Sequence, residues 1–139
     1  GSLQQLEGFE LNRNAHLSHC LKTDYTVSID RGAGQVKIGL PAFVPGLDTA
    51  AAPGASHLRL LGACSEIDFA AGKYRSSHKK TPWLALNQEQ GARQIEMLLK
   101  TNWPAFIILG LEYSQRVNQV YYPLSGAGAR ALALVKVVQ

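Results

Sequence analysis

Cysteine and charge are both scarce in this chain. Among 139 residues only Cys20 and Cys64 are cysteines, too few for the disulfide framework of a small secreted domain. Two buried free thiols are expected in preference to a Cys20–Cys64 bridge, which favours a reducing compartment such as the cytoplasm. Charged residues make up 17% of the chain and hydrophobic residues 46%, the opposite of the balance in disordered proteins.

Long apolar runs and targeting signals are also absent. No apolar run approaches the roughly 20 residues of a transmembrane helix, so no membrane insertion is expected. Gly1-Ser2 stands where an initiator methionine would be and resembles a cloning scar, and residues 3–6 lack the basic start of a signal peptide. We therefore expect one domain over residues 3–139, cut from a longer protein.

Apolar and polar side chains alternate with the period of two that is typical of half-buried strands. The pattern predicts strands at 25–30, 35–40, 57–61, 65–69, 73–77, 83–86, 105–113, 120–124 and 131–138. Gly62 is expected to mark a bulge between two of them. The segment 88–100 fits either a strand or one helical face, and its short length before Pro104 favours a strand.

About eight or nine short strands with turn signals between them predict an all-β fold. The expected architecture is a two-sheet antiparallel β-sandwich of the immunoglobulin or fibronectin-III type. Three prolines break the connection 41–56, where a turn at 48–52 would be the only helix. No repeat or break in composition divides the chain.

Metal-ligand residue types are dense at only one place. His16, His19 and Cys20 lie close in sequence, but in an extended stretch His19 would point away from the other two. Zinc requires three or four converging ligands, and no second cluster supplies them. The sequence predicts no metal site and no cofactor.

Catalytic motifs are missing as well. The segment 125–128 places a serine beside glycines but lacks the Gly-x-Ser-x-Gly elbow, and 32–34 lacks a phosphate-loop lysine. Acidic residues are scattered. Glu66 and Asp68 share one predicted strand face, where a pair two residues apart is expected to be solvated. We predict that the protein is not an enzyme.

The candidate binding residues are cations and aromatic rings: Lys73, Tyr74, Arg75, Lys79, Lys80, Trp83 and Trp103. Nucleic-acid sites combine cations with stacking rings, but a charged edge strand that discourages aggregation has the same composition and is favoured here. The two tryptophans lie near prolines at predicted strand ends. They would serve either as a sugar platform or as core.

Several segments resemble an uncharacterised family of bacterial proteins. They are residues 6–12, 25–31, 41–45, 66–69, 109–113, 117–118 and 122–124. Longer members of that family carry a basic amino-terminal region, so the resemblance implies that this chain is a C-terminal domain. It implies no activity, ligand or functional residue.

The sequence thus predicts a non-catalytic interaction or assembly module within a larger protein. The expected partner is protein, either a second copy or another chain, in preference to nucleic acid. The apolar segment 132–138 would pair across a subunit edge. The alternative is a carbohydrate- or ligand-binding module that uses loop aromatics. The partner's identity and the oligomeric state stay open.

Overall fold

The computed structural model describes residues 3–12, 15–126 and 128–139, so Gly1-Ser2 and part of the glycine-containing segment 125–128 lie outside the described residues. The strands described are β1 (Thr26–Asp30), β2 (Gln35–Leu40), β3 (His57–Asp68), β4 (Lys73–Lys80), β5 (Leu84–Ala85), β6 (Arg93–Leu98), β7 (Ala105–Val117), β8 (Val120–Pro123) and β9 (Arg130–Val138). The helices are a 3-10 turn, η1 (Leu3–Leu6), and two short α-helices, α1 (Leu17–Cys20) and α2 (Pro45–Asp48).

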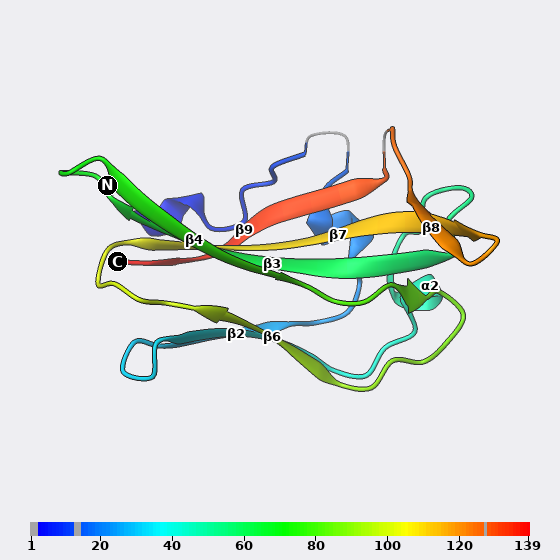
Figure 1. The fold of residues 1–139 in the computed structure, drawn as a ribbon, viewed down its shortest axis with the longest axis horizontal. Helices are drawn as coiled ribbons and strands as arrows, with labels where there is room; N and C mark the ends of the chain where they lie inside the picture. The colour runs from blue at the N-terminus through cyan, green and yellow to red at the C-terminus, as the bar shows by residue number, and fades with distance from the viewer. Residues whose placement is uncertain (1–2, 13–14, 127) are drawn as a thin grey trace.

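The strands form two antiparallel sheets that face each other (Figure 1). The smaller sheet has the order β1-β2-β6. The larger, six-stranded sheet has the order β4-β3-β7-β8, with β5 paired to β3 and β9 paired to β7. This arrangement confirms the predicted all-β, two-sheet sandwich.

The core lies between the sheets and follows the alternation seen in the sequence. Leu58 and Leu60 on β3 are fully buried, whereas the intervening Arg59 faces outward with its partner Glu112 on β7. Ile95 and Met97 on β6 are buried opposite Ile38 and Val36 on β2, which confirms a strand in the segment 88–100. Each sheet therefore has a buried, apolar inner face and a more exposed outer face.

Four details of the prediction were wrong. β3 is one continuous strand of 12 residues, not two, and Gly62 is regularly paired with Lys79 and Leu109 instead of forming a bulge. The reason is close packing: a Cβ on Gly62 would lie 2.7 Å from the Met97 sulfur. Two α-helices form instead of one, and the turn expected at 48–52 lies earlier, at Pro45–Asp48.

The amino-terminal segment covers the free edge of β9. The Gly8 and Leu11 amides donate to the Leu134 and Leu132 carbonyls, and the Leu134 amide donates to Phe9. The edge that we expected to pair with another subunit is therefore already occupied over this stretch. The amino-terminal residues supply strand contacts at Leu132 and Leu134, so pairing with a subunit is opposed there, and pairing over the rest of 132–138 stays a prediction.

Both cysteines are buried and free, as predicted. Burial raises the pKa of the Cys64 thiol to about 11, and the Glu66 carboxylate adds to this shift. Burial, followed by the Glu10 carboxylate, also raises the pKa of Cys20. Neither thiol is a ready nucleophile at neutral pH, because the thiolate is the reactive form.

Candidate functional site

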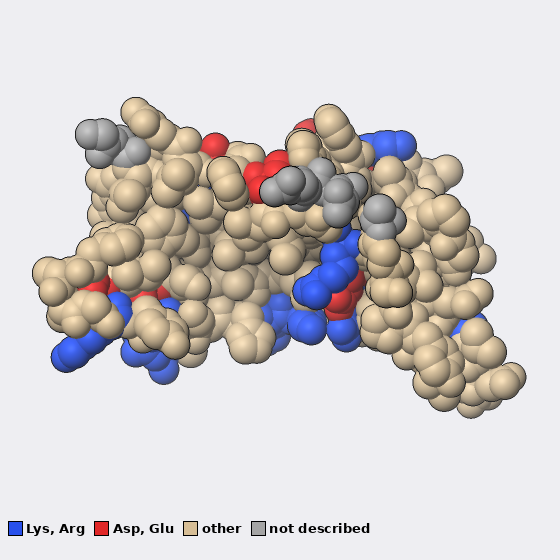
Figure 2. All heavy atoms as spheres, turned by 90° about the horizontal axis from the view of Figure 1, so that it is seen from above, with Lys and Arg blue, Asp and Glu red and all other residues tan. Residues whose placement is uncertain are grey.

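The outer face of the six-stranded sheet is hollowed into an open groove of about 250 Å³. We call it the outer groove; it is lined by Leu11, Leu61, Gly62, Ala63, His78, Lys79, Lys80, Ile108, Arg130 and Leu132. Its walls are aliphatic along β3, β7 and β9, while the cations come from β4 and β9. Figure 2 looks onto this face and shows the hollow, with basic and acidic side chains gathered beside it.

Gly110 has no side chain, which leaves room for Leu132, one of the residues that line the outer groove. It lies opposite Leu61 on β3 and Leu132 on β9, in the middle of the sheet. The Leu132 side chain lies over Gly110, and any Cβ at that position would collide with it. The groove floor thus depends on a glycine between two leucines.

A cluster of charges lies at one end of the outer groove. Its centre is Glu112, whose side chain is only 8% exposed. The Arg59 Nε donates a hydrogen bond to Glu112 Oε1, Lys80 Nζ lies 3.9 Å from the same oxygen, and Arg130 Nε lies 3.5 Å from Oε2. We call these four residues the Glu112 cluster. One carboxylate forms ion pairs with three cations, so this face carries an excess of positive charge.

Stacked rings hold one of these cations in place. The Arg59 guanidinium lies 4.2 Å from the centre of the Trp83 ring. Trp83 stacks on Tyr121 with 5.9 Å between ring centres and 19° between their planes, and Arg116 lies over Tyr121. This sequence of cation, ring, ring and cation restricts the Arg59 side chain, so its charge is presented at a fixed position.

The predicted binding residues do not form one site. The register places Lys80 opposite Leu61 at the outer groove and Lys73 opposite Asp68, about 23 Å away along the strand. Tyr74, 78% exposed, lies at that far end, whereas Arg75 forms an ion pair with Glu66. Only Lys79 and Lys80 line the outer groove. Trp83 adjoins it through Arg59.

The two tryptophans are far apart. Trp83 directly precedes β5, whose Leu84 pairs with Leu58. The Trp103 carbonyl accepts a hydrogen bond from Arg31 at the other end of β3, near Glu66. Eight residues of strand separate these ends, roughly 26 Å, so the tryptophans form no common sugar platform.

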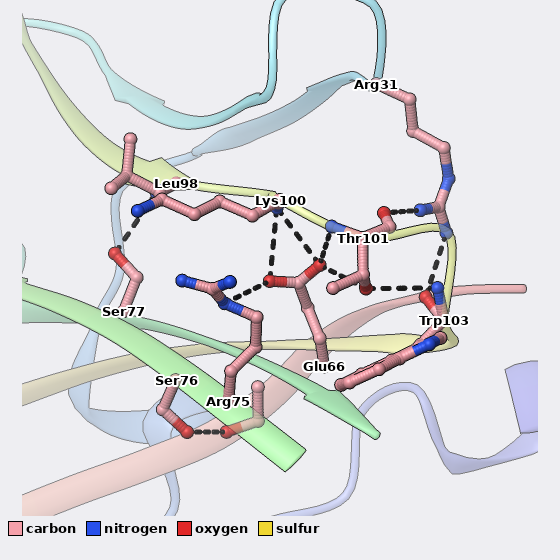
Figure 3. Close-up of polar contacts among 10 residues, drawn as sticks. Arg31, Glu66, Arg75, Ser76, Ser77, Leu98, Lys100, Thr101 and Trp103 are labelled. Carbon is pink, nitrogen blue, oxygen red and sulfur yellow. Dashed lines mark hydrogen bonds and ion pairs between the residues drawn. The ribbon is translucent and has the colours of Figure 1, made fainter. Parts of the chain in front are cut away.

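Glu66 is the second buried carboxylate and corrects the expectation that it would be solvated. It is 1% exposed and accepts hydrogen bonds from the amides of Lys100 and Thr101 and from the Thr101 hydroxyl at 2.6 Å (Figure 3). The Arg75 Nε lies 3.5 Å away. Burial opposes ionisation, but these hydrogen bonds and Arg75 hold the pKa of Glu66 below its usual value. The residue ties β3 to the segment between β6 and β7.

Ser56 and His57 form a serine–histidine pair beside Arg116. Ser56 Oγ lies 2.8 Å from His57 Nδ1, but it also accepts a hydrogen bond from the Arg116 amide. Burial and the nearby Arg116 charge lower the pKa of His57. In the described part of the chain no carboxylate hydrogen-bonds to this histidine, and its ring packs edge-on against Tyr121.

His16, His19 and Cys20, the dense group of metal-ligand residue types in the sequence, lie at the short helix α1. Leu17–Cys20 is helical and His16 is its N-cap, so the two histidine rings stack with 5.6 Å between their centres while Cys20 is buried. Within the described residues no group of three His, Cys, Asp or Glu side chains is placed to hold a metal ion. No helix among them has the length and apolar character to cross a membrane.

Arg59, Glu112 and Arg130 were missed by sequence reasoning. Glu112 did carry a signal, because it is the one charge within the apolar segment 105–113. No family model, curated protein or solved structure matches the chain. The resemblance to a bacterial family stays a prediction, and the site must be interpreted from its own geometry.

Proposed function

We propose that this domain is a non-catalytic protein-binding module and that the outer groove is its binding surface. The observation that carries the proposal is the combination of a half-exposed aliphatic groove with the positively charged Glu112 cluster. Aliphatic walls favour an apolar side chain of the partner, and excess positive charge favours acidic residues near it. An acidic segment of another protein has both features.

The contacts of Trp83 favour a protein partner over a sugar or a nucleic acid at the outer groove. Trp83 already has a guanidinium over its ring and a tyrosine stacked beside it. Bases and sugars bind to ring faces that are free in the unbound protein. The tryptophan therefore serves to position Arg59 instead of offering a stacking surface.

A charge placed in the outer groove tests the proposal. Ala63 lies half-exposed between Ile108 and His78 in register, so Ala63→Glu would fill the groove and repel an acidic partner. Ser28→Glu, on the exposed outer face of the smaller sheet, is the matched control. Both variants and the wild type would be immobilised, and the retained proteins quantified by mass spectrometry.

We expect the wild type and Ser28→Glu to retain the same protein and Ala63→Glu to lose it. Thermal unfolding of each variant checks that the domain remains folded. Equal retention by a folded Ala63→Glu variant would contradict the proposal, and so would the absence of any specifically retained protein.

A further inference from the structure

The cations and the groove have a defined spacing. Arg130 and Leu132 lie two residues apart on β9, so their side chains leave the same face of the strand about 7 Å apart. On the other side of the groove, Lys80 lies directly opposite Leu61. If one side chain of a ligand fills the groove, the side chain two positions further along the ligand can therefore reach both Lys80 and Arg130.

We infer that the outer groove recognises an extended segment with an apolar residue and an acidic residue two positions away. The apolar side chain fills the groove, and the carboxylate binds Lys80 and Arg130. In an extended chain, side chains two positions apart lie on one face with the same spacing of about 7 Å. A volume of about 250 Å³ holds one or two aliphatic side chains. This inference rests on the protein-binding role proposed above.

Glu112 is the resident carboxylate of this site. In the free protein it engages Lys80 and Arg130, which are 47% and 55% exposed and so remain open to a ligand. An incoming carboxylate must share these cations with Glu112. Glu112 thus competes with an acidic ligand for these cations and lowers its affinity.

The experiment uses short peptides as probes. The test peptide is Gly-Gly-Leu-Ser-Glu-Gly-Gly. One control replaces glutamate with glutamine, and a second exchanges the order of serine and glutamate so that the carboxylate leaves the opposite face. Each is titrated into the ¹⁵N-labelled chain and followed by amide chemical shifts. We expect shifts at Leu61, Ala63 and Leu132 with the test peptide and at least a threefold weaker response with either control.

Three variants test the roles of individual charges. Removing one close ionic contact at an exposed site changes affinity by up to about fivefold. Arg130→Gln should weaken binding of the test peptide by about this factor, and Glu112→Gln should strengthen it similarly. Lys73→Gln, at the far end of β4, should leave it unchanged. If Glu112→Gln fails to fold, Arg130→Gln against Lys73→Gln decides the question.

Several results would overturn the inference. They are equal responses to all three peptides, a loss of affinity in folded Glu112→Gln, or an unchanged affinity in Arg130→Gln. Tighter binding of a twelve-nucleotide oligothymidine at the same amides would show a nucleic-acid site instead. If Ala63→Glu still abolishes partner retention while the peptides fail, the acidic recognition is wrong and the protein-binding function stands.

Discussion

Glu66 forms more hydrogen bonds and ion pairs than any other side chain drawn in Figure 3. Replacing it with alanine would leave the Lys100 and Thr101 amides and the Thr101 hydroxyl without their acceptor. We expect Glu66→Ala to lower the free energy of unfolding by about 3 kcal/mol, measured by urea denaturation.

Glu96→Ala is the control for this change. Glu96 is 50% exposed and forms a 3.9 Å ion pair with Lys37 on the sheet surface. Such pairs contribute little, so this variant should stay within about 0.5 kcal/mol of the wild type. Equal effects of the two substitutions would show that the buried hydrogen bonds of Glu66 add nothing.

The same residue predicts a pH dependence. Because the folded-state pKa of Glu66 lies below its usual value of 4.5, the unfolded chain takes up this proton first as the pH falls. The stabilisation by Glu66 is therefore complete above the unfolded pKa and is lost as the pH falls through the folded pKa. The difference in unfolding free energy between wild type and Glu66→Gln should shrink below about pH 4.5. A difference that stays constant from pH 7 to pH 3 would refute this.

Single residues were the least predictable level. The burial of Leu58 and Leu60 followed from alternation alone, because period two identifies one face of a strand. The burial of Glu66 did not, because its acceptor role depends on amides 34 and 35 residues away in sequence. Alternation predicts which face of the sheet a side chain lies on, but not which groups form hydrogen bonds with it.

At the scale of elements, Gly62 sets the distance between β3 and β6. A Cβ there would lie 2.7 Å from the Met97 sulfur and 2.9 Å from an Ile95 methyl. Gly62→Ala should therefore destabilise the domain by about 2 kcal/mol, despite the gain in strand propensity. Gly91→Ala, where nothing lies within 4 Å, should be neutral or slightly stabilising. Thermal unfolding of both variants decides it, and a Gly62→Ala variant as stable as Gly91→Ala would contradict this account.

Most strands were predictable from the sequence, but the continuity of β3 through Gly62 was not. The hairpin of β1 and β2 follows from alternation on either side of a turn, where Gly34 takes a φ of 69°. Gly62 looked like an interruption of β3 because a glycine in a strand often marks a bulge. Its true role depends on Met97, which the sequence alone does not place beside it.

At the scale of the whole molecule, two sheets with the expected inner faces were predictable, and the outer groove was not. The Glu112 cluster joins Arg59 on β3, Lys80 on β4 and Arg130 on β9. These strands become neighbours only through the order β4-β3-β7 and the pairing of β9 with β7. The local run of charges along the sequence is the stretch 73–80, most of which lies away from the groove. The immunoglobulin or fibronectin-III subdivision stays a prediction.

Site-specific photo-cross-linking tests most directly whether the outer groove is the binding surface. A photoreactive amino acid would replace Ala63 in the outer groove or, separately, Ser28 on the outer face of the smaller sheet. The proposed function predicts a discrete adduct with one protein from position 63 and none from position 28. Adducts from position 28 alone, or equal adducts from both positions, would contradict it.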